Sequence, residues 1–304
     1  MSGFKRDRQG NAKRQDGFPK PAPKQQIERN AFTPMFENLR DELDAHHDRR
    51  DRIGKASRDI TALSKKIIFS LQRVRKIDEH LPEDIQKEID TRLAEISKLL
   101  ASIAPDVQGI NRLRYARSLV CLEELVEALT FYHYLKTQTL ITQDQLTPIV
   151  EDLTRRGFVV EDEVMGNSEA AEDISSEQQP SDQAKATPTV GLTDDDYLYG
   201  LFDLTGEMMR FATTTSALSG KMASSDAASD GRDIVHDMHE LGTFFEMLPL
   251  RTGNRSMWEK KLEVTRQSVQ KVEKLGYDLK IRGSERPKGW VPDLRSTDQP
   301  GSPE

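Results

Sequence analysis

Apolar residues recur at intervals of three and four along most of this 304-residue chain, which places them on one face of an α-helix. The first such stripe runs from Phe32 to about Ile77 and predicts a helix longer than most helices of globular proteins. A second stripe starts behind Pro82, a residue suited to the first turn of a helix, and Pro105 ends it. The first third of the chain therefore predicts two long amphipathic helices.

The same spacing continues through the rest of the chain. A third helix is predicted from about Asn111 to Lys136, and Thr142 begins a short fourth helix that fades near Gly157. Thr193 is suited to cap the next helix, because aspartates follow it in the first turn. Further helices are predicted over residues 194–219, 230–248 and 254–282, the last closed by Gly283. With no alternating strand pattern and no Gly-rich phosphate loop, the sequence predicts an all-α fold, an antiparallel bundle of about seven helices.

Three polar stretches frame a single helical domain over residues 32–290. Residues 1–31 are predicted to form a disordered basic tail, and residues 291–304 a second disordered tail. The domain is interrupted at about 158–191 by a predicted disordered loop, whose residues 161–190 hold eight acids and one lysine.

The net charge of −7 therefore arises largely in one loop and does not exclude a nucleic-acid ligand, although it argues against a sequence-blind DNA coater. Basic residues of the N-terminal tail form either a nuclear import signal or a solvated tail: Lys5, Arg6, Arg8, Lys13 and Arg14. Cys121 is the single cysteine, so an intracellular location is expected, cytoplasmic and nuclear. No apolar run is long enough to cross a bilayer, so no membrane partner is expected.

Four acids at helical spacing are the main candidates for chemistry. Glu124 and Glu127 are three residues apart, and Asp203 and Glu207 are four apart, so each pair shares one face of its helix. If the two helices pack together, the four carboxylates meet. A confined group of acids needs a cation, and hard oxygen ligands favour Mg²⁺.

Each acid pair also has a structural interpretation. Glu124 and Glu127 lie on a helix that is apolar over much of its circumference, where they would form an ion pair with Arg117 or with a basic residue of another helix. Asp203 and Glu207 lie on a polar stripe that would simply face solvent.

Other candidates are weaker. Two basic clusters would bind nucleic-acid phosphates or merely solvate their helices: Lys65, Lys66 and Arg73, and Arg112, Arg114 and Arg117. His236 and His239 suggest a zinc motif only superficially, because they are three residues apart and not four. His133 is expected to be packed or hydrogen-bonded. No arrangement of a nucleophile with its base is present.

Several separated motifs, in order, resemble the translin family, and within it the branch of translin-associated proteins. They cover approximately residues 32–290. The motifs are Ser57–Thr61 with Ser64–Lys66, Val126–Ala128 with Tyr134–Thr137, Asp196–Gly200 leading into Asp203–Arg210, and Lys271–Glu273 through Tyr277–Glu285.

The resemblance implies a bundle of seven helices that assembles with translin into a closed hetero-octameric shell holding RNA. It also implies the catalytic subunit of an endoribonuclease that depends on Mg²⁺, or alternatively Mn²⁺, with catalytic and metal-binding roles for Glu124, Glu127, Asp203 and Glu207. Translin, which binds RNA without cleaving it, lacks the acids that correspond to the first three. The family suggests single-stranded or processed small RNA as substrate, such as small-RNA passenger strands or tRNA precursor fragments, and single-stranded DNA as a further ligand.

Two alternatives remain open. In the first, the chain is a non-catalytic nucleic-acid-binding or scaffold subunit of a translin-type oligomer, and its acids are structural. In the second, it is a DNA-binding adaptor that acts in the nucleus through the basic tail.

Overall fold

The computed structural model describes residues 30–165, 187–225, 231–249 and 255–282. It divides the chain into two compact units, Met1–His46 and His47–Glu304. The described part of the first unit is helical from Thr33 onwards. The predictions for residues 1–29, most of the acidic loop, Gly283 and the C-terminal tail lie outside the described residues.

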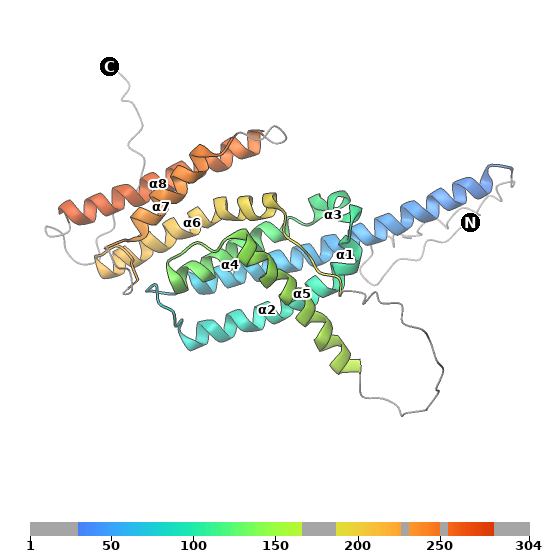
Figure 1. The fold of residues 1–304 in the computed structure, drawn as a ribbon, viewed down its shortest axis with the longest axis horizontal. Helices are drawn as coiled ribbons and strands as arrows, with labels where there is room; N and C mark the ends of the chain where they lie inside the picture. Colours follow the sequence, from blue (N-terminus) through green and yellow to red (C-terminus); the bar gives the residue numbers. More distant parts are fainter. Residues whose placement is uncertain (1–29, 166–186, 226–230, 250–254, 283–304) are drawn as a thin grey trace, which may run out of the picture. The chain divides into compact units, whose positions relative to one another are not determined.

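The described residues are almost entirely helical, which confirms the predicted all-α class (Figure 1). No strand forms among them, and the one isolated bridge joins Ile77 to Ser225. The α-helices are α1 Thr33–Leu71, α2 Glu83–Ile103, α3 Ile110–Arg114, α4 Cys121–Thr137, α5 Gln143–Met165, α6 Asp194–Ser219, α7 Ile234–Met247 and α8 Arg255–Arg282. No helix of the described ranges has the length and apolar character that a bilayer span requires.

Helix starts and stops follow the local chemistry. Pro82 is the residue before α2, whose first turn carries acids. Thr193 and Asp196 form a reciprocal capping box at the start of α6, in which each side chain accepts a hydrogen bond from the other's backbone N–H. Gly220 ends α6 in the left-handed conformation, at φ 70°. The predicted starts of α2 and α6 are thus confirmed.

Two predicted helices were wrong in their bounds. The third is broken into α3, a 3₁₀ turn and α4, because the chain bends between Tyr115 and Leu119 and buries both side chains. The fourth, α5, does not fade near Gly157 but continues to Met165. Gly157 is where α5 lies against α2, since a Cβ atom there would be 2.1 Å from the carbonyl oxygen of Ser97.

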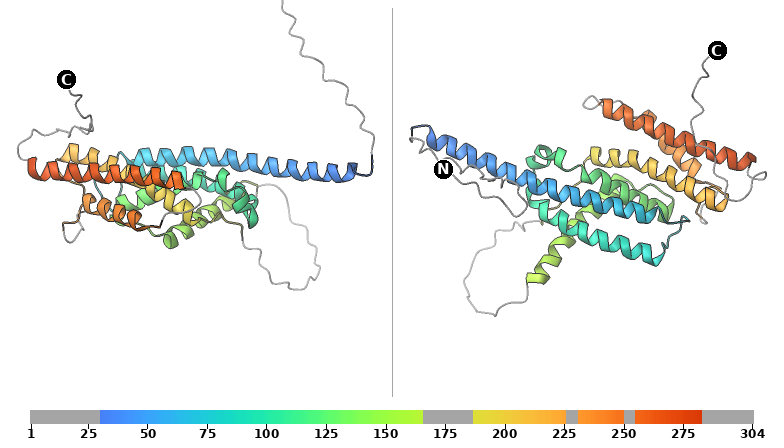
Figure 2. Two further views of the ribbon diagram at one scale, coloured as in Figure 1. Left: turned by 90° about the horizontal axis from the view of Figure 1, so that it is seen from above. Right: turned by 180° about the vertical axis from the view of Figure 1, so that it is seen from behind.

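The helices of the second unit pack in a connected series. Helix α4 lies against α6, α6 against α8, and α8 against α7, while α2 pairs with α5 (Figures 1 and 2). Aromatic side chains fill the region between α6, α7 and α8. The Phe202 ring stacks on Phe245 with 4.0 Å between centroids, and the edge of Trp258 meets Phe202 at 5.1 Å. This core fixes α8 beside α6.

Candidate functional site

Gly200 lets α4 and α6 approach closely. A Cβ atom at this position would lie 2.6 Å from Cγ1 of Val126 and 2.8 Å from the carbonyl oxygen of Glu123, both on α4. Only glycine permits such an approach of two helices. Asp203 follows one turn after Gly200 on α6, and Glu124 and Glu127 flank Val126 on α4. The close contact therefore sets the acid pairs of the two helices beside each other.

The buried carboxyl of Glu127 has the other three predicted acids around it. Its residue is only 7 % exposed. Burial, and to a lesser degree the charges of Asp203, Glu124 and Glu207, raise the pKa of Glu127 to about 8. The three other carboxyl groups thus lie within electrostatic range of Glu127, although no three of the four side chains converge on one point among the described residues. We refer to Glu124, Glu127, Asp203 and Glu207 as the acid cluster.

Two members of the acid cluster are paired with lysines of other helices. Lys65 of α1 lies 3.2 Å from Oε1 of Glu124, so the ion pair considered for Glu124 forms with Lys65. The ammonium of Lys261 on α8 donates to both carboxylate oxygens of Asp203, at 2.7 Å each. Asp203 therefore does not simply face solvent.

Glu207 is held by an amide, and Glu127 by nothing comparable. Nε2 of Gln72 donates to Oε2 of Glu207 at 2.7 Å and to the Glu207 carbonyl at 3.0 Å, while Arg210 lies 3.5 Å from Oε2. The Oε1 atom of Gln72 is buried and accepts no hydrogen bond from the described residues. Within the same ranges, the Glu127 carboxyl has neither a hydrogen-bond donor nor an ion-pair partner, so it is the member of the acid cluster that contacts no cation directly, although the charge of Lys261 acts on it from a distance.

Sequence reasoning missed three residues of this region. Glu123 lies 3.9 Å from the Lys261 ammonium. Burial raises the pKa of Glu123 to about 7, although Lys261 lowers it in part. The sequence signal for Glu123 was its position directly before Glu124. Lys261 and Gln72 gave no signal, because they lie on charged stretches far along the chain from the acids that they contact.

The donor set fits a hard divalent cation, although the side chains are not arranged around one. No three His, Cys, Asp or Glu side chains among the described residues are grouped closely enough to hold a metal ion. Carboxylate oxygens are nevertheless the ligands that Mg²⁺ and Mn²⁺ prefer. The buried, unpaired Glu127 is destabilised by its acidic neighbours, and a cation would relieve this. The acid cluster is therefore a candidate metal centre.

The raised pKa of Glu127 predicts how stability changes with pH. Because the folded pKa of about 8 exceeds the ordinary value of 4.5, folding favours the protonated acid. In the absence of divalent cations, the contribution of Glu127 to the free energy of unfolding should therefore be fully present below about pH 4.5 and be lost as the pH rises through 8, on the order of a few kcal/mol. Urea unfolding at several pH values, with Glu127→Gln as control, measures this. An equally steep fall in the variant would assign the effect to other groups.

Some of the predicted nucleic-acid contacts are engaged in ion pairs. Arg73 lies 2.8 Å from Glu88, and Arg112 is paired with Asp196 at the start of α6. Arg114 donates to the side chain of Asn111 at 3.4 Å. Of the remaining three, Lys65 pairs with Glu124, and Lys66 and Arg117 are exposed. Arg112 thus anchors the capping box, whereas Lys66 and Arg117 are accessible to a ligand.

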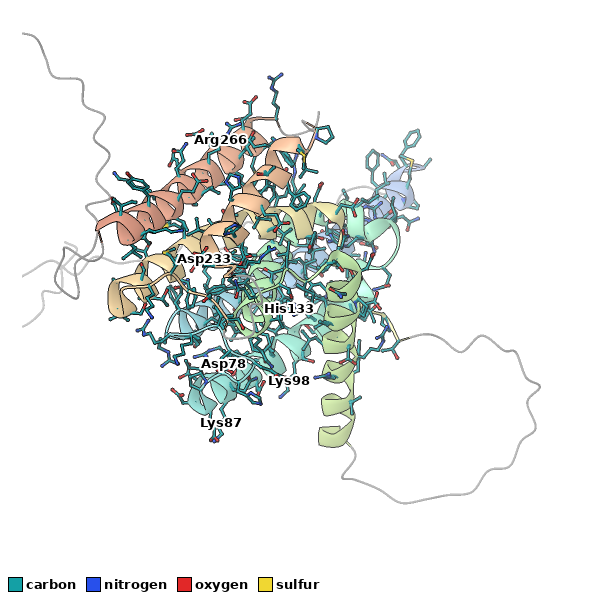
Figure 3. The ribbon with its side chains drawn as sticks, turned by 60° about the vertical axis from the view of Figure 1, so that its left-hand side comes forward. Asp78, Lys87, Lys98, His133, Asp233 and Arg266 are labelled. Atoms are coloured by element: carbon teal, nitrogen blue, oxygen red, sulfur yellow. The ribbon has the colours of Figure 1, made fainter. Side chains whose placement is uncertain are left out.

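The histidines form no common site. His239 pairs with Glu273 at 2.8 Å, and His236 lies 3.8 Å from Asp233, the capping residue of α7 that Figure 3 labels. Nε2 of His133 is hydrogen-bonded to the Thr139 hydroxyl at 3.1 Å, which agrees with the expected hydrogen bond of this side chain. His236 and His239 thus engage separate acids instead of converging on one ion.

Cys121 at the start of α4 is fully buried. Burial raises the pKa of its thiol to about 11, so the thiolate that a nucleophile requires is not populated near neutral pH. This agrees with a structural role.

The amino-acid sequence is similar to those of known proteins along most of its length. The chain is 31 % identical to translin-associated protein X of Pongo abelii over 290 residues, covering 93 % of this chain and 91 % of that protein. The Mus musculus protein of the same name is 30 % identical over the same shares. The translin-associated protein X homolog of Schizosaccharomyces pombe is 26 % identical, over 83 % of this chain and 89 % of that protein.

The fold also matches solved structures. The crystal structure of apo-NeC3PO superposes with a TM-score of 0.51 at 18 % identity, covering 79 % of this chain and 95 % of that one, and so shares the fold. Residues 48–283, which include every member of the acid cluster, match the translin family. On this match and on the similarity along nearly its whole length, the chain belongs to the translin family.

Proposed function

We propose that this chain is the catalytic subunit of a Mg²⁺-dependent endoribonuclease that assembles with translin. The observation that carries the proposal is the acid cluster, in which two packed helices place three carboxyl groups around that of the buried Glu127. The similarity to translin-associated protein X supports translin as the partner. The substrate class is single-stranded or processed small RNA, as the family resemblance implies.

The residues of the chain have distinct tasks in this proposal. Glu124, Glu127, Asp203 and Glu207 would hold the cation, and Mn²⁺ would serve in place of Mg²⁺. Gln72 keeps the Glu207 carboxylate oriented through its 2.7 Å hydrogen bond. The close contact at Gly200 fixes the separation of the two acid pairs. When bound, the cation would shield the phosphodiester charge and lower the pKa of a water molecule, which favours hydrolysis with a 5′-phosphate on the product.

Removal of metal tests the proposal. The full chain, purified together with translin, should cleave a labelled single-stranded RNA in Mg²⁺ and lose this activity in excess chelator. Added Mg²⁺ or Mn²⁺ should restore it, because carboxylate oxygens bind either ion and the bound ion supplies the activation of water. The measurement is product formation on a denaturing gel, with translin alone as control. Cleavage that persists in chelator, or that translin alone performs equally well, would contradict the proposal.

A non-catalytic subunit is the second candidate. It is favoured by the pairing of three acids with Lys65, Lys261 and Arg210, as in structural ion pairs. The same assay separates the two candidates, since a scaffold subunit adds no metal-dependent cleavage to the complex. The adaptor that would bind DNA through its N-terminal tail depends on residues outside the described ranges.

A further inference from the structure

The ammonium of Lys261 lies between acids of α4 and α6, at the edge of the acid cluster. Its Nζ atom lies 2.7 Å from both carboxylate oxygens of Asp203, 3.9 Å from Glu123 and 3.4 Å from the carbonyl oxygen of Tyr199. It is also 5.4 Å from the centre of the Tyr199 ring, within reach of a cation–π contact. Its positive charge further acts on Glu127. One lysine thus compensates several acids of both α4 and α6.

The other two cations at the acid cluster are held less firmly. The side chains of Lys65 and Arg210 are 53 % and 55 % exposed, so water and salt screen their pairs with Glu124 and Glu207. The Lys261 side chain is only 19 % exposed. Trp258, one turn earlier on α8, is fully buried and fixes this part of the helix. Lys261 is therefore the compensating charge built into the fold.

The position of Lys261 conflicts with a metal ion on Asp203. Its ammonium occupies both oxygens through which this carboxylate would bind a cation. A lysine ammonium is a compact point charge on a flexible stem, so it is able to turn aside when another cation arrives. Each carboxylate oxygen keeps a second lone pair, but a divalent ion on Asp203 would lie close to the ammonium, and the repulsion between the two positive charges makes them compete for this carboxylate.

We infer that Lys261 is an exchangeable counter-ion, which neutralises Asp203 while no divalent cation is bound and leaves that carboxylate when one binds. The inference rests on the proposed function, because it requires Asp203 to be a metal ligand. Lys261 acts here as a positioning residue, since it acts through Asp203. It sets the concentration of Mg²⁺ at which the acid cluster takes up an ion, because each binding event has to displace the ammonium.

Titration calorimetry with Mn²⁺ on the full chain tests the inference without an activity assay. Lys261→Met keeps the length of the stem and removes the competing charge. The affinity of this variant for Mn²⁺ should therefore rise by about tenfold, the change in a binding constant that corresponds to one modest charge–charge interaction. Lys261→Arg keeps the charge and should stay near the wild type. Lys260→Met is the matched control, since Lys260 is the exposed neighbour on the same helix. Its affinity should be unchanged.

The possible results separate this inference from the proposed function. If Lys261→Met binds Mn²⁺ no more tightly than the wild type, while Asp203→Asn weakens binding, Asp203 is a ligand and the competition is refuted. If neither the wild type nor the Lys261 variants bind Mn²⁺, the metal centre itself is refuted, and the inference with it. Lys261→Gln provides a second variant should the methionine fail to fold, and the same increase is expected for it.

Discussion

Replacing Glu127 by glutamine is expected to lower RNA cleavage by the translin complex at least about a hundredfold while the fold persists. The substitution replaces one oxygen of the central carboxylate by an amide nitrogen and removes its negative charge from the acid cluster. Losing a few kcal/mol of charge stabilisation in the transition state corresponds to such a factor. The fold should tolerate the change, because burial raises the pKa of Glu127 to about 8 and the native side chain is therefore largely neutral at pH 7 without metal.

The measurement is the initial rate of cleavage at saturating Mg²⁺, together with the melting temperature in chelator. Glu83→Gln serves as the matched control, because this acid is 93 % exposed at the side chain and lies at the start of α2. A Glu127→Gln complex that cleaves as fast as the control would remove the acid cluster from the chemistry. A large drop in melting temperature would instead indicate a structural role for this carboxyl.

Alanine at two glycines of α6 should change stability in opposite directions. At Gly200 the new Cβ would lie 2.6 Å from Val126, so α4 and α6 have to separate, at a cost of about 1–3 kcal/mol. At Gly206 no atom lies within 4 Å of the new Cβ, and alanine should stabilise the helix by about 1 kcal/mol. The two substitutions are chemically identical and lie on one helix.

Urea unfolding of both variants measures the difference. The Gly200 variant should also lose cleavage activity, since the acid pairs move apart with their helices, whereas the Gly206 variant should retain it. Equal stability of the two variants would show that the close contact at Gly200 is not maintained in solution.

Elements that depend on local sequence were predicted well. The apolar stripe after Pro82 predicted α2, and the capping pattern at Thr193 predicted the start of α6, because caps and helical periodicity act over only a few residues. Where a contact with a distant part of the chain determines the extent of a helix, the prediction from local sequence was wrong. Gly157 suggested a helix end, yet α2 makes it necessary inside α5. A glycine is typical both of a helix end and of a close contact between two helices, and only the position of the neighbouring helix distinguishes the two.

In the candidate site too, local features were predicted from the sequence, whereas long-range contacts were not. The spacing of Glu124 with Glu127 and of Asp203 with Glu207 predicted two faces, and the packing of α4 on α6 brings them together. Their partners could not be predicted, because an ion pair such as that of Asp203 with Lys261 joins residues 58 positions apart. Periodicity identifies the face on which a charge lies, but it does not identify the charge on the opposite helix.

The order in which the helices are synthesised bears on the acids of α4 and α6. The ammonium that compensates Asp203 comes from α8, the last described helix. A nascent polypeptide that ends before Arg255 carries all four carboxyl groups but lacks this lysine. Charge balance at these acids is therefore completed only after α8 has been synthesised, so that translation products that stop before this helix would hold mutually repelling acids and fold poorly.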